Sequence, residues 1–358
     1  MQSGTKGGDV AGARMKDVAA RAGVSIKTVS NVVRGAAKVA EPTRLRVERA
    51  IAELDYRPHA SARHLRTGRS GIIALAFPEL VAPYFAELAA EVVVAAKEHG
   101  YTVLIEDTGG DPDEELRIAS GLTDSLIDGV LLSPLRLDQA RLAALEQTVP
   151  LVLLGERSYD IAADHVLIDN AAAAREATEH LLALGRRRIA VIGHQTDPPF
   201  ATSAQRMHGY FTALHAAGVP YDPRLAPPVR SFGRAEGAEA MSRLLDLDHR
   251  PDAVFCFSDL LASGALRVAH ERHVEVPHDM AVVGFDDLEE SRYAVPSLTT
   301  VSPDKREIAR MAVAALLDRM SDEPVNLPTT LTAGHRLVVR ESSAGRPSTP
   351  TGPGTGDA

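Results

Sequence analysis

The sequence predicts an α/β protein in which two halves, each built on a parallel β-sheet, follow a small all-α unit. From residue 72 onward, short Val/Ile/Leu-rich segments alternate with amphipathic helical segments, a pattern typical of parallel sheets with helices on both faces. These strand candidates outnumber the roughly six strands of a sheet of usual size, so we expect two sheets with a cleft between them. Residues 15–55 show only helical periodicity. With 358 residues, the chain is long enough for two or three compact units.

The N-terminal unit is predicted to contain three short helices. The first, Met15–Ala22, places its apolar residues on one face and stops at Gly23, which permits a left-handed turn. Ser25 then caps a second helix, Ile26–Val33. A third helix follows a Glu-Pro-Thr start signal and runs to Leu54 with apolar residues near the helical period.

The rest of the chain is predicted to alternate strands with helices. The strand candidates are Ile72–Phe77, Thr102–Glu106, Gly129–Leu132, Leu151–Leu154, Ile189–Ile192, Ala253–Cys256 and Ala281–Gly284. The main helices are expected at Phe85–His99, Ala171–Leu184, Met207–Ala217, Leu260–His273 and Ile308–Met320. The Gly-rich residues 1–14 and the Pro/Gly/Ser/Thr-rich residues 343–358 are expected to be disordered.

Charge divides the chain into a basic head and an acidic body. Residues 14–69 contain 13 Lys and Arg residues against five Asp and Glu residues, a net charge of +8. The whole chain carries −9, so residues 70–358 carry −17. A basic head attracts a polyanion and an acidic body repels it, so we expect the head to bind a polyanionic partner.

Composition also indicates where the protein works. Its one cysteine, Cys256, excludes a disulfide-stapled domain and favours a reducing, cytoplasmic location. The polar N-terminus has no apolar core of a secretory signal. The most apolar stretch, Ile72–Ala96, is interrupted by prolines and glutamates and falls short of the ~18 uncharged residues of a membrane span. We therefore expect a protein that does not enter a membrane.

The spacing of the first two predicted helices is that of a helix-turn-helix, whose second helix enters the major groove of DNA. Ile26, Lys27 and Asn31 project outward from this second helix, one suited to a thymine methyl group and two suited to purine edges. The hydroxyls of Thr28 and Ser30 suit phosphate oxygens at the positive end of the helix. From spacing alone, a small helical bundle with a solvated basic face remains the alternative. The DNA-contacting residues predicted here are Ser25, Ile26, Lys27, Thr28, Ser30 and Asn31.

Several short motifs follow one another in order in the first seventy residues. They are Lys16-Asp17-Val18-Ala19, Ala22-Gly23-Val24-Ser25, Thr28-Val29-Ser30, Val39-Ala40-Glu41-Pro42-Thr43-Arg44, Leu54-Asp55-Tyr56-Arg57-Pro58 and Ala60-Ser61-Ala62-Arg63-His64-Leu65-Arg66-Thr67-Gly68. Together they closely resemble the DNA-binding headpiece of the lactose/galactose-repressor family of transcriptional regulators. The resemblance implies a headpiece at 15–58, a hinge at 59–69 and an effector-binding and dimerisation domain at 70–342.

The resemblance also implies a role for the hinge. In that family the matching stretch folds into a helix on DNA, pairs with its dimer mate in the minor groove, and inserts a leucine, here Leu65, into the central base step. Two apolar wedges at one step unstack it and kink the duplex; the alternative for Leu65 is an ordinary linker residue. The hinge residues expected at DNA are Ala62, Arg63, Leu65 and Arg66. Arg34, Lys38 and Arg44 are interpreted as phosphate contacts, with a merely solvated basic surface as the alternative.

The acidic body contains no motif that favours catalysis. It has no G-x-G-x-x-G after a strand, no Walker loop and no G-x-S-x-G elbow. The pair His270 and His273 has a spacing that could bind zinc, but surface histidines are the commoner explanation. The acidic cluster around Asp286 and Asp287 has no recognisable nucleophile beside it. We therefore expect no enzyme activity, no cofactor and no metal.

The body is similar along its length to the family's effector domain, which is itself like the periplasmic sugar-binding proteins. This implies a two-lobed, periplasmic-binding-protein-like (type I) fold with parallel sheets, whose ligand sits between the lobes at the carboxyl ends of the strands. The positions that match the family's ligand contacts are Tyr84, Phe85, Phe200, Thr202, Arg206, Phe232, Ser258, Asp259 and Asp286.

The chemistry of these residues suits a polyol. Arg206 and Asp286 can bind vicinal hydroxyls by charge-assisted hydrogen bonds, while aromatic rings stack on an apolar sugar face. Alternatively, Asp286 is a turn residue after a buried strand and Arg206 pairs with it. Phe200 stands where purine-responsive members of the family carry an arginine, which argues against guanine or hypoxanthine as the effector.

These expectations combine into a homodimeric transcriptional regulator, most simply a repressor, that binds a palindromic DNA operator and responds to a small molecule, by family frequency a sugar. The tetramer-forming heptads of the lactose repressor are missing after Arg340, so a dimer is expected. Two rivals come from other classes: a stand-alone sugar-binding transport protein, which has no use for the basic head, and a sugar-metabolising enzyme, which needs a catalytic constellation.

Overall fold

The computed structural model describes residues 13–33, 39–56, 69–121, 127–144, 149–155, 159, 161–196, 201–321 and 327–344. The chain divides into two compact units, Met1–Ser70 and Gly71–Ala358. Residues 59–68 of the predicted hinge lie outside the described residues, as do Arg34, Lys38 and Phe200; the hinge residues concerned include Ala62, Arg63, Leu65 and Arg66.

The first unit is a three-helix fold with a small apolar core. Its helices are α1 (Met15–Ala22), α2 (Ile26–Val33) and α3 (Glu41–Glu53), which confirms the three predicted helices, although α3 begins three residues earlier than predicted, with the Glu-Pro-Thr signal inside its first turn. Each helix contributes one fully buried valine to the core, namely Val18, Val29 and Val47. Gly23 adopts a φ of 63°, the left-handed turn that separates α1 from α2. The turn therefore sets the angle at which α2 leaves α1.

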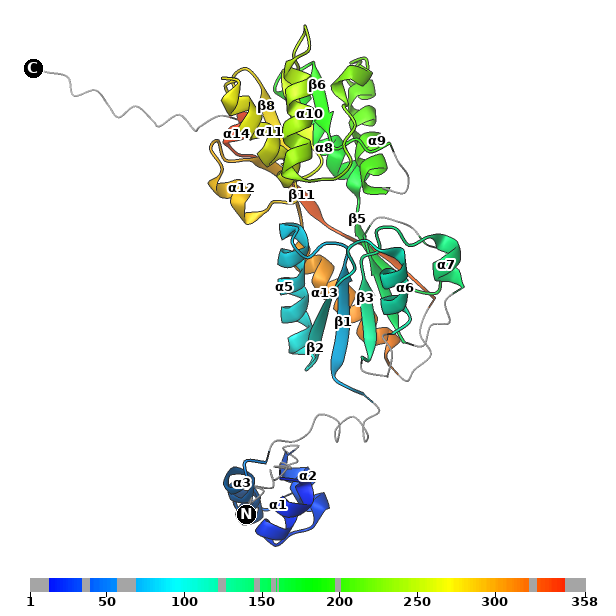
Figure 1. Cartoon of the computed structure of the whole chain (residues 1–358), viewed down its shortest axis with the longest axis vertical. Helices are drawn as coiled ribbons and strands as arrows, with labels where there is room; N and C mark the ends of the chain where they lie inside the picture. The colour runs from blue at the N-terminus through cyan, green and yellow to red at the C-terminus, as the bar shows by residue number, and fades with distance from the viewer. Residues whose placement is uncertain are drawn as a thin grey trace, which may run out of the picture. The chain divides into compact units, whose positions relative to one another are not determined.

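The second unit consists of two lobes (Figure 1). Lobe 1 has a six-stranded sheet in the order β10-β5-β4-β3-β1-β2, and every neighbouring pair is parallel. Its strands are β1 (Ile72–Phe77), β2 (Thr102–Asp107), β3 (Gly129–Leu132), β4 (Leu151–Leu154), β5 (Asp164–Ile168) and β10 (Thr330–Ala333). Its helices are α5 (Pro83–Glu98), α6 (Pro112–Ala119), α7 (Gln139–Ala143) and α13 (Lys305–Arg319).

Strand β1 shows why this sheet is buried on both faces. Ile73 and Leu75 pack in the cluster that contains residues of α5, whereas Ala74 and Ala76 pack in the cluster that contains residues of α6. Successive side chains of a strand point to opposite faces, so both faces must be apolar, which explains the continuous apolar run in the sequence.

Lobe 2 has a five-stranded sheet in the order β11-β9-β8-β7-β6. Its strands are β6 (Ile189–Ile192), β7 (Ala253–Cys256), β8 (Ala281–Phe285), β9 (Thr299–Pro303) and β11 (His335–Val338). Its helices are α8 (Asn170–Ala183), α9 (Ala201–Ala216), α10 (Arg234–Leu245), α11 (Asp259–Glu271), α12 (Glu289–Tyr293) and α14 (Glu341–Ala344), with a 3₁₀ turn η1 (Pro223–Leu225). Strand β11 runs antiparallel to β9, so the expectation of parallel strands holds for this sheet except at that edge.

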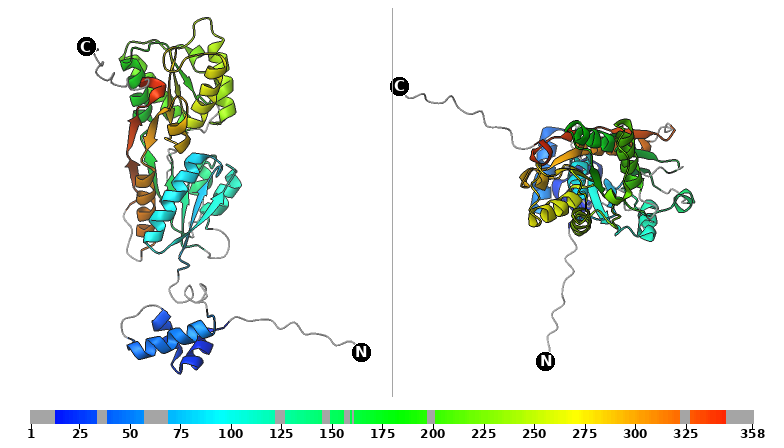
Figure 2. Two further views of the ribbon diagram at one scale, coloured as in Figure 1. Left: turned by 90° about the vertical axis from the view of Figure 1, so that its left-hand side faces the viewer. Right: turned by 90° about the horizontal axis from the view of Figure 1, so that it is seen from above.

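The chain passes between the lobes three times. It crosses after β5 at Asp169, after β9 at Asp304 and after β10 at Gly334. The second and third crossings are joined, because the Asp304 N–H donates to the Gly334 carbonyl at 2.9 Å. As a result, α13 and β10 belong to lobe 1 although lobe 2 precedes them in the chain. Figure 1 and the left view of Figure 2 show α13 close to the cyan helix α5. Three short connections let the lobes turn relative to each other while staying attached.

No helix of the described residues is both long and apolar enough to cross a bilayer. In the same part of the chain, no group of three or more His, Cys, Asp and Glu side chains is arranged to hold a metal ion.

Candidate DNA interface and effector site

The start of α2 presents the candidate DNA-reading residues. The Ser25 hydroxyl accepts a hydrogen bond from the Thr28 N–H at 3.1 Å, which is the N-cap that the sequence predicts. Ile26 is 53% exposed, and Lys27 is exposed beside it. Val29, one turn further along the helix, is fully buried in the core of the unit. The first turn of α2 therefore offers an apolar and a cationic side chain together, the pair expected of a major-groove contact.

Other predicted DNA contacts lie in less open positions. Thr28 is partly buried, and its hydroxyl lies 2.9 Å from that of Ser25. Ser30 is only 8% exposed, and Asn31 is partly buried on the last turns of the helix. Arg44 at the start of α3 lies 3.9 Å from Glu41. Ser30 thus has less access to a phosphate than Ser25 or Lys27.

In lobe 1 an aromatic pair follows the carboxyl end of β1. Tyr84 and Phe85 open helix α5, and their ring centroids are 5.4 Å apart in an edge-on arrangement. Phe85 also stacks on Phe77, the last residue of β1, at 5.0 Å. The Nζ atom of Lys305 lies 5.7 Å from the centre of the Tyr84 ring. Phe77 therefore fixes Phe85, and Phe85 in turn fixes the Tyr84 ring.

In lobe 2 Arg206 ties several elements together at the carboxyl ends of the strands. It projects from α9 and is 5% exposed. Its Nε donates to the Asn170 side-chain oxygen at 2.7 Å, and a terminal nitrogen donates to the Phe257 carbonyl. Its guanidinium carbon lies 3.4 Å from the centre of the Phe285 ring. Burial of a guanidinium is costly unless its N–H groups are paired, so these contacts fix the orientation of the side chain.

The predicted acidic contact lies in a backbone conformation that L-residues rarely adopt. Asp286 follows β8 directly with a φ of 115°, and Asp287 has a φ of 47°. Asp286 is 9% exposed, and its N–H donates to the Val301 carbonyl at 2.8 Å. Such strain persists only where the surroundings enforce it, and it is common at ligand clamps.

The neighbouring Asp287 is bound inside the protein. Its carboxylate accepts a hydrogen bond from Arg340 at 2.5 Å, and both side chains are largely buried. Burial works to raise the pKa of Asp287, but the hydrogen bond and charge of Arg340 hold that pKa below its ordinary value. Asp287 is therefore ionised and anchors the segment that carries Asp286.

Ser258 and Asp259 make hydrogen bonds within lobe 2. The Ser258 hydroxyl caps α11 and donates to the Phe232 carbonyl at 3.1 Å. Asp259 is 2% exposed, and its carboxylate accepts hydrogen bonds from three groups. The donors are the Ser291 hydroxyl at 2.6 Å, the Thr300 hydroxyl at 2.6 Å and the Leu288 N–H at 2.9 Å. Burial raises the pKa of Asp259 to about 6, against the opposing effect of these bonds.

The remaining predicted effector contacts are placed as follows. Phe232 is partly buried, with its ring centroid 6.5 Å from that of Phe257. Thr202 is partly buried on the first turn of α9, one turn before Arg206. Thr202 therefore lies on the same helix as Arg206, and Phe232 lies in lobe 2 beside Ser258, which donates to its carbonyl.

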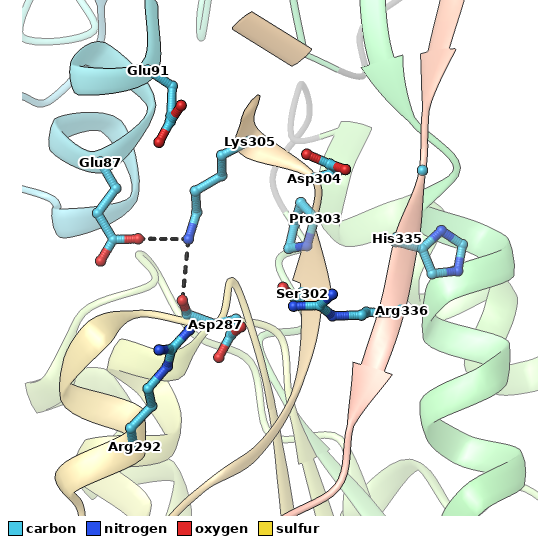
Figure 3. Close-up of a pocket in the computed structure, with 11 residues that line it drawn as sticks. Glu87, Glu91, Asp287, Arg292, Ser302, Pro303, Asp304, Lys305, His335 and Arg336 are labelled. Carbon is cyan, nitrogen blue, oxygen red and sulfur yellow. Dashed lines mark hydrogen bonds and ion pairs between the residues drawn. The ribbon is translucent and has the colours of Figure 1, made fainter. Parts of the chain in front are cut away.

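The structure adds two residues that the sequence did not indicate, Glu87 and Lys305. They line a cavity of about 430 Å³ next to the inter-lobe crossings (Figure 3). The Lys305 ammonium contacts Glu87 at 2.6 Å and donates to the Asp286 carbonyl at 2.5 Å. Since Lys305 also lies against Tyr84, it shows that Tyr84 of lobe 1 and Asp286 of lobe 2 flank the same place. No local pattern connects residues 218 positions apart, so only the fold reveals the pair.

Comparison with known proteins agrees with this two-unit organisation. Residues 14–59 match the bacterial regulatory proteins of the lacI family, and residues 178–343 match the periplasmic binding protein-like domain. The chain is 34% identical over 336 residues to the HTH-type transcriptional repressor CytR of Escherichia coli K12, covering 94% of this chain and 97% of that protein.

Two solved structures are informative. The complex of the transcriptional regulator CelR with cellobiose is 35% identical and superposes with a TM-score of 0.69 over 92% of this chain and all of that one. The lac repressor dimer bound to operator and the anti-inducer ONPF is 27% identical, with a TM-score of 0.80 over 93% of this chain and 99% of that chain.

A helix-turn-helix unit joined to a two-lobed ligand-binding domain defines a ligand-responsive transcriptional regulator that binds DNA and is not an enzyme. The chain belongs to the lacI family of bacterial regulatory proteins. The family expected from the sequence motifs, and the α/β fold with parallel sheets and a helical headpiece, are thereby confirmed.

Proposed function

We propose that this regulator represses transcription as a homodimer on a palindromic operator and that a sugar bound between its lobes controls it. The observation that carries the proposal is the meeting of Tyr84 from lobe 1 with Asp286 from lobe 2 around Lys305, at the carboxyl ends of the strands. Ligands of open α/β sheets bind at this end of the strands. An aromatic residue and an acidic residue that flank one place suit a ligand ring that carries hydroxyl groups.

The sugar effector is supported by chemistry and by a relative. Arg206 and Asp286 provide a charged donor and a charged acceptor for vicinal hydroxyls, while Tyr84 and Phe85 provide faces for stacking. CelR, 35% identical to this chain, has been solved with cellobiose. Phe200, in place of the arginine of purine-responsive members, argues against a purine. A β-linked glucose disaccharide is therefore the first effector to test.

The dimer and its operator are supported by two observations. The lac repressor, 27% identical to this chain, has been solved as a dimer on operator. In lobe 2, Tyr293 is 77% exposed and Val295 is 86% exposed beside a groove of about 410 Å³. Exposed apolar side chains next to an apolar-lined groove suit burial against a second copy of the chain. A two-fold dimer reads an inverted repeat.

We assign the remaining DNA contacts as the motifs imply. Residues 15–58 form the reading head, and residues 59–69 form a hinge that folds on DNA and inserts Leu65 into the central step. Arg34, Lys38 and Arg44 neutralise phosphates, so binding falls steeply with salt. The disulfide-free chain with its buried Cys256 suits the cytoplasm, where operators lie.

The mechanism follows from the three crossings. A ligand that contacts both lobes favours one relative rotation of lobe 1 and lobe 2. Each hinge leaves the start of lobe 1, so in a dimer this rotation changes the separation of the two hinges. Ligand binding therefore changes the affinity for DNA, because both depend on how large a fraction of the protein adopts one lobe arrangement.

The test combines two measurements on the full chain. In a thermal-shift assay with cellobiose and a set of mono- and disaccharides, one sugar class is expected to raise the Tm of the protein. In a gel-shift assay, the protein is expected to bind inverted-repeat DNA, and the same sugar is expected to change that binding. A chain that binds sugar but no DNA supports a stand-alone binding protein instead. Turnover of the sugar supports an enzyme and contradicts the proposal.

A further inference from the structure

An ion pair in lobe 1 forms hydrogen bonds with the segment of lobe 2 that carries Asp286. Glu87 projects from α5, and Lys305 opens α13, which packs against α5 in the same lobe. The Lys305 Nζ donates to Glu87 Oε2 at 2.6 Å and, across the lobes, to the carbonyls of Asp286 at 2.5 Å and Asp287 at 3.2 Å. Glu87 Oε1 accepts the N–H of Glu289 at 3.1 Å. Figure 3 shows Lys305 between Glu87 and Asp287.

Lys305 is fully engaged inside the protein. An ammonium group has three N–H donors, and three acceptors surround this one. Its side chain is 13% exposed, so the contacts are stronger than those of a surface pair. Both oxygens of Glu87 are also used. The pair therefore has no donor left for a ligand while these contacts persist, and its action must pass through the segment that it holds.

That segment, residues 286–289, is anchored from both lobes. From lobe 2, Val301 accepts the N–H of residue 286 and Asp259 accepts the N–H of residue 288. From lobe 1, Lys305 fixes the two carbonyls and Glu87 fixes the last N–H. The anchored carbonyls belong to the residues with φ of 115° and 47°. Lobe 1 thus helps to hold the strained conformation that orients the Asp286 carboxylate.

We propose that Lys305 and Glu87 form a latch between the lobes, acting as positioning residues that stabilise the present lobe arrangement and orient Asp286 for the effector. The regulatory part of this inference rests on the proposed function. Any rotation that draws residues 286–289 away from α5 breaks three inter-lobe hydrogen bonds at once. The latch therefore sets how much differential affinity an effector must supply to change the arrangement.

The experiment measures the inter-lobe distance in the full-length chain without DNA or effector. Spin labels on Glu98→Cys in α5 and Glu271→Cys in α11 report the distance, and both positions are exposed. The native Cys256 is fully buried and stays unlabelled. In this background Lys305→Met removes the cation, and Glu87→Gln removes the anion but keeps hydrogen-bonding atoms.

Each variant has a matched control. Glu91→Gln removes a carboxylate one turn further along α5 from the same cavity, and Arg306→Met removes an exposed cation next to Lys305. Lys305→Met is expected to move the ratio of lobe arrangements by about tenfold, within the range typical of coupling between sites. Glu87→Gln is expected to move it in the same direction by less. The double variant should equal Lys305→Met, because both changes remove one network.

The latch proposal is wrong if Lys305→Met and Glu87→Gln give the same inter-lobe distance distributions as the two control variants. Should Lys305→Met not fold, as judged by circular dichroism, Glu87→Gln alone decides in the same way. Because the distance is measured without DNA, failure to bind any inverted repeat overturns the proposed function and leaves this result intact. Conversely, operator binding with unchanged distances keeps the function and rejects the latch. A third readout is rescue: Lys305→Arg keeps the charge and is expected to restore most of the parent distribution.

Discussion

The guanidinium of Arg206 lies over the ring of Phe285, with its central carbon 3.4 Å from the ring centroid. This contact joins α9 to the end of β8, immediately before Asp286. Arg206 therefore supports the strand end that carries Asp286, and in the function we propose it also offers its charge to the effector. Substitutions at this site should separate binding from stability.

Replacement of Arg206 by lysine is expected to keep the charge but lose the planar stacking and the paired hydrogen bonds. The Asn170 oxygen and the Phe257 carbonyl then lack their donor, so unfolding free energy should fall by about 1–3 kcal/mol. Effector-induced thermal shift with cellobiose should disappear. Arg267→Lys on the exposed side of α11 serves as the control, and equal losses in both variants contradict the assigned role.

Asp286→Gly is expected to abolish effector binding while maintaining or raising stability by up to about 1 kcal/mol. Glycine adopts a φ of 115° without strain, so the substitution relieves backbone strain in the folded state. It also removes the carboxylate that we propose binds the effector. Asp287→Gly should behave in the opposite way, because it leaves Arg340 without its carboxylate in a buried place, at a cost of about 3–5 kcal/mol. Urea unfolding of both variants measures the contrast. A marked loss of stability in Asp286→Gly contradicts the strain argument.

The buried Asp259 predicts a pH dependence of stability. Its folded-state pKa is raised to about 6 from an ordinary value of 3.8, so its protonated form is favoured by folding. The corresponding stability is fully present below pH 3.8 and is lost as pH rises to about 6. Relative to Asp259→Asn, the parent protein should lose roughly 1–3 kcal/mol between pH 4 and 6.5. Denaturation of both proteins across that range measures the difference, and parallel curves reject the prediction.

Leu65→Ala tests the proposed hinge wedge. Loss of two apolar wedges at one base step should weaken binding to an inverted repeat by a few kcal/mol at most, while binding to random DNA stays nearly unchanged. Titration by gel shift at one fixed salt concentration measures both affinities. Equal losses on the two DNAs indicate a general linker role instead.

Strands buried on both faces could be predicted from the sequence because they read as continuous apolar runs. The β1, β3, β4, β6 and β7 boundaries agree with the predicted segments. The missed strands have this signal only in part or not at all: β5 begins with an aspartate and a histidine, β10 is mostly exposed, β11 is partly exposed, and β9 contains three hydroxyl residues and a proline. Their β-structure comes from pairing at the crossings and the sheet edges, which periodicity does not record.

The candidate site divides in the same way. Motif resemblance placed Tyr84, Arg206 and Asp286 near the strand ends, where the structure also has them. It assigned Asp259 to the ligand, whereas the fold directs that carboxylate to Ser291 and Thr300. Whether a polar residue after a strand faces a cleft or the interior depends on the helix that covers it. The sequence next to the strand does not contain that information.

The route of the chain has a consequence for its synthesis. Helix α13 packs on β3, β4 and β5 of lobe 1, and β10 completes that sheet beside β5, yet both are encoded after the whole of lobe 2. A nascent polypeptide that has left the ribosome only as far as residue 170 lacks the cover for one face of its first sheet. Lobe 1 therefore keeps one face of its sheet exposed until translation has passed residue 333. Most of lobe 2 can fold before lobe 1 is complete.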